Sequence, residues 1–430
     1  MVRPHIWIGV LALLVISGCR KDKDGAAPSI SILSPDQGTV FSIPDTIVVR
    51  FTVSDDRTVE STVVQLIDAN GVSIAPSINT SVGGPGGTIV NELIINSERI
   101  LSGQYEIMVR ASDGTNDSRA FRTIQIQGTP LRLRSIFVAP PPTTATATIQ
   151  RIDSTGQLSD WTTVQDLNGA AIDGYSQHVM LAGSQFAPFQ ALPTDTWSYA
   201  WSYLPPANDA PEQFTALVVD PYDGRTYFAT RNGFIRGFTG EGAQRFTAQT
   251  LTGYRCYAVT VLGDRIATWQ RAIAQPEQRV VTYTVSGTIL DILPVEQDLV
   301  ELFQWSNTSA HLFANEFGHG KVIDIYIATG GAQEIRVFQD EEIRAVARMD
   351  PSTFYIALQD RIVAYDHSTN TVVQLITGVM ASAMAYEPAT GALLVAQGND
   401  LLTIDPRTGA LMTSISTGAP IGSILPLRNR

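Results

Sequence analysis

The sequence predicts an all-β fold, and two observations carry this prediction. From Pro28 onward, apolar and polar residues alternate with a period of two, which is the period of half-buried strands and not of helices. From Arg132 onward, a strand pattern recurs at intervals of about 40 residues, a spacing typical of repeated sheets. The 430 residues are 44% apolar and only 16% charged, the composition of a packed protein of two or three domains.

The charge balance excludes one class of partner. The sequence holds 29 Lys and Arg against 41 Asp and Glu, a formal net charge of −12, and it has no cluster of cations. Nucleic-acid binding relies on basic patches that attract phosphates, so the sequence predicts no nucleic-acid partner.

Residues 1–18 have the pattern of a secretory signal peptide. One cation, Arg3, precedes an unbroken apolar run of eleven residues from Ile6 to Ile16. As a helix this run would rise only about 16 Å, whereas the hydrocarbon core of a bilayer is about 30 Å thick. The run therefore matches the apolar region of a signal peptide and is too short to span a membrane.

The signal region ends in Ile16-Ser17-Gly18-Cys19, an apolar residue and two small residues followed by cysteine. This motif resembles the lipobox of bacterial lipoproteins. The resemblance implies that the Cys19 thiol receives a diacylglyceryl group, that residues 1–18 are removed and that the freed amine is acylated. Two or three acyl chains such as palmitate, at about 0.8 kcal/mol per buried methylene, make a stable anchor. An ordinary secretory signal with a chance cysteine is the alternative.

Residues 19–27 form a short tether that contains the charged run RKDKDG. It resembles the spacer behind the lipid cysteine in outer-membrane lipoproteins of glycan-scavenging diderm bacteria, where some Lys/Asp-rich spacers mark export to the cell surface. We therefore expect a lipid-anchored protein of the bacterial outer membrane that faces the cell surface or the periplasm. Cys256 is the other cysteine of the chain, so the folded region can form neither an intramolecular disulfide nor a thiolate metal cluster.

Residues 28–128 have the strand pattern of an immunoglobulin-like β-sandwich. Ile47, Val49 and Phe51 alternate with polar neighbours, and about seven short strands fit into this length. Tyr105 and the two residues ahead of it, at the start of another alternating strand, resemble the tyrosine corner of such domains. The Cys…Trp…Cys signature of antibody domains is absent, so the resemblance is to disulfide-free bacterial modules.

Two turn or loop signals separate these strands. The Asn70-Gly71 step is typical of a tight hairpin, and the Gly-Gly-Pro-Gly-Gly sequence of residues 83–87 predicts a flexible loop. Further strands are expected near residues 88–95, 104–111 and 119–126.

Four clustered aspartates, Asp55, Asp56, Asp113 and Asp117, are the candidates for calcium in this domain. Calcium needs six or more oxygen ligands, and immunoglobulin-like modules sometimes hold it between loops. The alternative is that these residues are ordinary turn formers, and the sequence favours that alternative. No other cofactor is expected.

The repeat in residues 131–430 predicts a β-propeller with one four-stranded blade per period. Its clearest copies are small-apolar strands that end in an acidic residue and proline, at residues 215–221, 345–351 and 383–388. Together with weaker copies, the blades start near residues 171, 215, 257, 302, 343 and 381. Three strands within residues 132–167 and the last strand, 421–427, would complete a seventh blade from both ends of the chain and remove its exposed edges. Six and eight blades are the alternatives.

The turn from Asp405 to Gly409, of the form Asp-x-x-Thr-Gly, resembles turns of quinoprotein-like and YVTN-like propellers. In quinoproteins an outer-strand Trp follows each such turn. Ala410, Leu411 and Met412 follow it here, so the resemblance implies no quinone cofactor. The Asp-box of sialidases and the Gly-His…Trp-Asp pair of WD40 repeats are absent as well.

Trp197, Tyr199, Trp201 and Tyr203 lie at a period of two and share one face of a predicted strand. Such a face can stack on sugars or peptides, which are the ligands that the compartment favours. The alternative is that these side chains fill the wedge between two blades, and the sequence favours this packing.

Residues typical of catalysis are sparse. His311, Glu316 and His319 have a spacing that fits neither a helical zinc motif nor ligands on one strand face. A surface loop across a turn is therefore expected, and a metal or acid/base site is the alternative. His178 and His367 stand alone in the sequence. Neither a Gly-x-Ser-x-Gly nucleophile elbow nor a phosphate loop occurs.

We therefore interpret the chain as a lipid-anchored binding or scaffold protein of the cell envelope. The N-terminal domain would serve as a stalk, and the propeller as an interaction platform for a glycan, a peptide or an outer-membrane protein of an uptake or secretion complex. The alternative is a propeller enzyme of the lyase or lactonase type with its site at the central channel. Inner-strand residues around Ala216, Ala347 and Ala385 supply no ring of His, Asp or Glu, which favours binding.

The lipobox leads to the first prediction. Because acylation needs the thiol, Cys19→Ser should move the protein from the membrane pellet into the soluble fraction. The wild type should incorporate labelled palmitate and the variant should not. A variant that still pellets with outer membranes, together with an unlabelled wild type, contradicts the lipid anchor.

Overall fold

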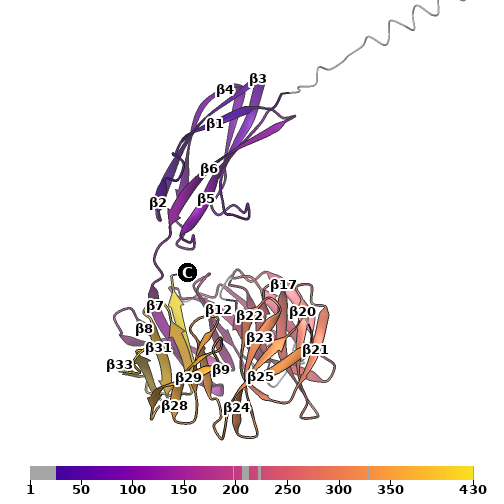
Figure 1. The fold of residues 1–430 in the computed structure, drawn as a ribbon, viewed down its shortest axis with the longest axis vertical. Coiled ribbons are helices and arrows are strands. Elements are labelled where there is room, and N and C mark those ends of the chain that lie inside the picture. The colour runs from indigo at the N-terminus through magenta and orange to yellow at the C-terminus, as the bar shows by residue number, and fades with distance from the viewer. Residues whose placement is uncertain (1–25, 197, 206–212, 221–223, 328, 430) are drawn as a thin grey trace, which may run out of the picture. The chain divides into compact units, whose positions relative to one another are not determined.

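The protein is all-β, as the sequence predicts. The structure is a computed structural model that describes residues 26–196, 198–205, 213–220, 224–327 and 329–429. The elements assigned in these residues are all β-strands (Figure 1). No helix in these ranges combines the length and apolar character that crossing a bilayer requires. The chain divides into two compact units, Met1–Pro130 and Leu131–Arg430, each described by itself below. Cys19 lies outside the described residues.

The described part of the N-terminal unit contains six strands: β1 (Ser29–Ser34), β2 (Val40–Ser42), β3 (Asp45–Ile67), β4 (Ile78–Ile95), β5 (Gly103–Ser112) and β6 (Asp117–Gln127). Their order is β1-β3-β5-β6-β2, and β4 pairs with β3. β2 runs parallel to β6, and the other pairs are antiparallel.

The length of β3 explains why the described part of this unit has six strands, whereas the sequence predicts about seven. It is 23 residues long and continues through an irregular stretch between Ser54 and Val59, where the sequence alone suggests two separate strands. Its first half pairs with β1 and its second half with β5, while β4 lies along both halves. Strand pairing therefore joins all six strands through β3.

Residues 83–87 lie within β4, so the expectation of a flexible loop is wrong for this segment. Gly86 has a φ of +111°, and a Cβ there would stand 2.1 Å from the carbonyl oxygen of Val53. A larger residue would clash with the backbone of β3. The glycines thus permit close strand pairing, which a composition-based argument for flexibility does not detect.

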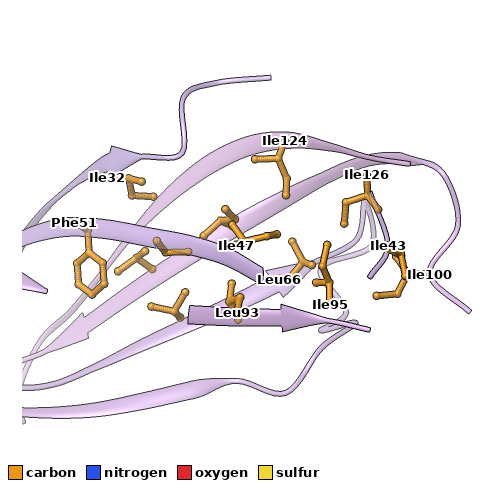
Figure 2. Packing of buried hydrophobic residues seen from close by; sticks show 14 residues of the cluster. Ile32, Ile43, Ile47, Phe51, Leu66, Leu93, Ile95, Ile100, Ile124 and Ile126 are labelled. Atoms are coloured by element: carbon orange, nitrogen blue, oxygen red, sulfur yellow. The ribbon is translucent and has the colours of Figure 1, made fainter. Parts of the chain in front are cut away.

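The core of this unit comes from the alternation that the sequence shows. Ile47, Val49 and Phe51 are each 0% exposed, because every second residue of β3 faces the same side. They pack in one cluster with residues such as Leu66 and Leu93 (Figure 2). Apolar burial of this kind is the main stabilising contribution in a domain without disulfides.

Tyr105 makes the hydrogen bond that is typical of a tyrosine corner. Its hydroxyl donates to the carbonyl oxygen of Leu101, four residues upstream, at 3.0 Å. This bond ties the start of β5 to the connection that precedes it.

In the described residues of the C-terminal unit, the strands form seven four-stranded antiparallel sheets. The first three consecutive sheets consist of β10 (Gly169–Asp173), β11 (His178–Ala182), β12 (Phe189–Pro193) and β13 (Trp201–Tyr203); β14 (Phe214–Val219), β15 (Thr226–Thr230), β16 (Phe234–Phe238) and β17 (Gln244–Gln249); and β18 (Tyr254–Leu262), β19 (Arg265–Ala272), β20 (Gln278–Thr284) and β21 (Ile289–Val295). The next three consist of β22 (Asp298–Ser306), β23 (Ser309–Glu316), β24 (His319–Tyr326) and β25 (Gly331–Phe338); β26 (Ala345–Arg348), β27 (Thr353–Ala357), β28 (Arg361–Asp366) and β29 (Thr371–Thr377); and β30 (Ala383–Glu387), β31 (Ala392–Gln397), β32 (Asp400–Ile404) and β33 (Leu411–Ser416).

The remaining sheet joins the two ends of the unit. β34 (Ser423–Arg428) pairs with β7 (Leu133–Ala139), which continues to β8 (Thr143–Asp153) and β9 (Leu158–Leu167). Figure 1 shows the yellow β34 beside the purple β7, and Leu425 faces Phe137 in their register. Strand β34 therefore occupies the first position of a sheet whose other strands come from the start of the unit.

The first strands of the sheets surround a common axis, as in a β-propeller. Each contacts the first strand of the next sheet, in the closed cycle β34-β10-β14-β18-β22-β26-β30-β34. The six consecutive first strands start within four residues of the positions that the repeat suggests. Apolar side chains fill the space between neighbouring sheets, for example Leu262 and Trp269 of one sheet against Leu302 and Leu312 of the next.

The pairing of β34 with β7 leads to the second prediction. Leu427 of β34 is 1% exposed and packs in a cluster with Phe137, whereas Leu411 of β33 is 55% exposed. Leu427→Ala should lower the free energy of unfolding by about 2–5 kcal/mol, because it leaves a cavity in the core. Leu411→Ala should change it by less than about 0.5 kcal/mol. Chemical denaturation of both variants measures this, and equal stabilities would contradict the packing of β34.

Candidate functional site

A cavity of about 520 Å³ opens where four neighbouring first strands end. Asp220 follows β14, Gly263 follows β18, Asn307 follows β22, and Arg348 is the last residue of β26. Gln304 and Trp305 of β22 line it as well. The cavity therefore lies at one end of the ring of first strands, along four neighbouring members of it, and we call it the channel-mouth pocket.

A β-bulge aims Trp305 at this pocket. Gln304 pairs with Ala310 and Ser306 with Ser309, so Trp305 is the extra residue between two regular pairs. A bulge of this kind redirects a side chain out of the normal alternation. The indole is 39% exposed, which is unusual for a large aromatic residue on an inner strand.

A smaller hollow of about 240 Å³ adjoins the pocket and shares Asp220, Gln304 and Arg348 with it. Glu301 of β22 lines this hollow. Its side chain is exposed to solvent, but the protein around it removes enough hydration to raise the pKa of its carboxyl to about 7. Glu301 therefore titrates close to neutral pH.

Behind Trp305 lies a cluster of two histidines and an aspartate, which we call the His-Asp-His cluster. The Nδ1 atom of His311 lies 2.7 Å from Oδ1 of Asp324, and Nε2 of His367 lies 2.9 Å from the same oxygen. Trp305 stacks on His311 with 4.8 Å between ring centroids and contacts His367 edge-on at 5.0 Å. One indole thus touches both histidines and also lines the channel-mouth pocket.

Two hairpins of neighbouring sheets hold the cluster in place. His311 of β23 and Asp324 of β24 are direct cross-strand partners, so their side chains start from neighbouring backbone positions. His367 follows β28 in the next sheet, and its backbone amide donates to the carbonyl oxygen of Ser352 at 2.8 Å. The cluster therefore bridges two neighbouring sheets.

Burial sets the electrostatics of the cluster. His311 is 0% and Asp324 2% exposed. Burial lowers the pKa of His311, although the hydrogen bond to Asp324 opposes this effect. Burial alone would raise the pKa of Asp324, but the hydrogen bonds and charges of the two histidines hold it below its usual value. The cluster accordingly holds an ionised carboxylate in a nearly dry environment.

These three residues are also the one metal-competent group found among the described residues. Their potential ligand atoms all lie within 4.8 Å of one another. The expectations that His367 stands alone and that His311 lies in a surface loop are both wrong. His311 is a fully buried strand residue, whereas Glu316 and His319 do face each other across the hairpin turn.

The aromatic strand, by which we mean the predicted strand that carries Trp197, Tyr199, Trp201 and Tyr203, is shorter than predicted among the described residues. Trp201 and Tyr203 belong to β13, are half-buried, and pack against the neighbouring sheet, where Phe238 lies 5.2 and 5.7 Å from their ring centroids. The Trp201 indole also donates to the carbonyl oxygen of Gly240 at 2.9 Å. Tyr199 is 62% exposed, and Trp197 lies outside the described residues. Ligand binding by these residues stays a prediction.

The four aspartates of the N-terminal unit make turn and ion-pair contacts. Asp55 accepts from the amides of Arg57 and Thr58, and Asp113 accepts from those of Thr115 and Asn116. These bonds use oxygens that a calcium ion would need.

The other two aspartates differ from this pair. Asp117 forms an ion pair with Arg110 at 2.7 Å, and Asp56 is exposed. None of the four belongs to the metal-competent group of the described residues, and calcium binding stays a prediction.

No protein-family model and no curated protein matches the chain. Solved structures do resemble it, among them β-propeller proteins. A quinonprotein alcohol dehydrogenase-like protein from Bacteroides thetaiotaomicron is 12% identical, with a TM-score of 0.46 over 92% of this chain and 99% of that chain. Sqt1 of Saccharomyces cerevisiae is 13% identical, with a TM-score of 0.47 over 69% and 90% of the two chains. The propeller domain of Cps50 (Swd1) from Myceliophteria thermophila is 9% identical, with a TM-score of 0.46 over 59% and 87%. At these identities no function can be transferred.

The aromatic strand leads to the third prediction. Trp201→Ala removes an indole that stacks on Phe238 and contacts Phe189, so it should lower the free energy of unfolding by about 3 kcal/mol. Tyr199→Ala, at an exposed aromatic two residues away, should change it by less than about 0.5 kcal/mol. Denaturant titrations compare the two variants, and a Trp201→Ala protein as stable as the wild type would speak against packing.

Proposed function

We propose that this chain is a lipid-anchored binding protein of the bacterial cell envelope. In this proposal Cys19 carries the lipid and residues 19–27 form the tether. Residues 28–128 form an immunoglobulin-like stalk, and residues 131–430 form a seven-bladed propeller closed by the 421–427 strand. The lipobox supports the anchor, the Tyr105 hydrogen bond supports the stalk assignment, and the closed cycle of first strands supports the propeller assignment.

We further propose that the propeller binds a saccharide at the channel-mouth pocket. The observation that carries this proposal is the exposed face of Trp305 in a cavity of about 520 Å³, a volume within the range of small-ligand sites. Sugar rings present flat C–H faces that stack on indoles and hydroxyl edges that need planar hydrogen-bonding groups. Gln304, Asn307, Asp220 and Arg348 line the same cavity with such groups.

Rigid elements position these groups before any ligand arrives. Trp305 is fixed from behind by His311, and the polar residues lie on or directly after the first strands of three sheets, each of which pairs with the second strand of its sheet. A site of this kind loses little conformational entropy on binding. Weak stacking and a few hydrogen bonds then suffice for a specific complex.

An enzyme with its site in the channel is the second candidate. Glu301 favours it, because a carboxyl group with a pKa of about 7 can act as a general acid or base near neutral pH. Arg348 lines the same hollow and could stabilise negative charge on a substrate. In this case the ligand of the pocket would be converted, and Glu301→Gln would bind it without product formation.

The binding of soluble oligosaccharides to the full-length protein in detergent tests the proposal and is the fourth prediction. A glycan panel identifies the best ligand, and calorimetry measures its affinity. Trp305→Ala should weaken this affinity about tenfold, the equivalent of about 1.4 kcal/mol for one aromatic stacking contact. Phe186→Ala, at an exposed aromatic that does not line the pocket, is the matched control and should bind like the wild type.

Two outcomes would contradict the saccharide proposal. One is that no oligosaccharide binds. The other is that Trp305→Ala binds as tightly as the control. Chromatography of the incubated glycan separates binding from turnover, since only an enzyme releases new products.

A further inference from the structure

We propose that His311, Asp324 and His367 bind a divalent transition-metal ion of the zinc type. The proposal concerns a site on the side of Trp305 that faces away from the channel-mouth pocket. It therefore stands independently of the saccharide proposed above.

The potential ligand atoms of the three side chains converge. Two imidazole nitrogens, Nδ1 of His311 and Nε2 of His367, point at the same carboxylate oxygen of Asp324, at 2.7 and 2.9 Å. The second carboxylate oxygen lies 3.0 Å from Nε2 of His367. Three potential ligand atoms from two hairpins thus converge, as metal coordination requires.

The donor set selects the class of ion. Two neutral imidazoles and one carboxylate suit zinc, copper, nickel and iron, whereas calcium and magnesium need more oxygen ligands than one aspartate supplies. Three protein ligands also leave at least one coordination position for a solvent molecule or an exogenous ligand. We therefore expect zinc to bind and calcium not to.

Burial favours occupancy by a cation. Asp324 is 2% exposed, and its ion-pair partners among the described residues are the two histidines. A carboxylate in such an environment is costly unless positive charge compensates it. A divalent ion supplies that charge without requiring either imidazole to be protonated.

The site would rearrange to accept the ion. Metal–ligand bonds of about 2.0–2.1 Å place neighbouring ligand atoms roughly 3.3 Å apart. The two nitrogen–oxygen separations of 2.7 and 2.9 Å would lengthen by a few tenths of an ångström, and ligand atoms that now lie within 4.8 Å of one another would draw together to this spacing. His367 can supply this movement, because it lies in the turn between β28 and β29 and its side chain is 9% exposed. His311 and Asp324 are held by the β23–β24 pairing and would keep their positions.

Trp305 offers a direct readout. Its ring centroid lies 4.8 and 5.0 Å from the two histidine rings, so a paramagnetic ion in the cluster would quench its fluorescence. Nickel and copper bind the same donor set as zinc. Quenching by nickel that zinc reverses would place both ions at one site.

The test, the fifth prediction, uses untagged full-length protein in detergent after removal of metals with a chelator. Calorimetry with zinc chloride should show one ion per chain, and an excess of calcium chloride should leave this zinc titration unchanged. His367→Gln can still donate a hydrogen bond to Asp324 but lacks the imidazole, and it should weaken zinc binding at least about tenfold. His319→Ala is the matched control, because this histidine lies in the same sheet, is 31% exposed and is not part of the cluster.

Thermal melts show whether each variant is folded, and Trp305→Phe should abolish the metal-dependent quenching while it keeps the zinc affinity. The proposal is overturned if the wild type binds none of zinc, nickel and copper, since the cluster is then a hydrogen-bond network only. It is equally overturned if folded His367→Gln binds zinc as tightly as His319→Ala does.

Discussion

The C-terminal unit depends on the pairing between β34 and β7, which joins residues almost 300 positions apart in the chain. A row of sheets that stays open leaves two edges with unpaired backbone groups and two apolar faces exposed to water. The Leu425 and Phe137 pair, together with the neighbouring contacts of β34 and β10, removes both costs at once. Because the first strands then surround one axis, residues at their ends face a common space.

This closure also explains where the candidate chemistry lies. Asp220, Trp305 and Arg348 belong to different sheets and are brought together only because successive first strands contact each other around the axis. The His-Asp-His cluster likewise depends on contact between neighbouring sheets. His311 and Asp324 meet across a hairpin, and His367 reaches them from the next sheet. Trp305 contacts both sites, so ligand and metal chemistry would share one aromatic side chain.

Most of the fold follows from local patterns, and most of the site does not. Alternation identifies the buried face of β3, and the repeat locates the first strands, because both patterns arise from periods that the backbone itself imposes. The glycine-rich residues 83–87 do not reveal their place in a strand, because the close approach of Gly86 to Val53 is a tertiary contact. No short motif contains the His-Asp-His cluster, because its members are 13 and 43 residues apart. The second separation is close to one repeat period, so polar residues one period apart are the sequence signal for such a cluster.

Hydrogen exchange of the full-length protein, read by mass spectrometry, tests the closing pairing most directly. If β34 is the first strand of a closed ring, amides of residues 423–428 should be protected as strongly as those of β7 and β14. They should also become exposed together with these strands as denaturant is added. Rapid exchange of residues 423–428 while β7 and β14 remain protected would contradict the closed arrangement on which the pocket and the cluster depend.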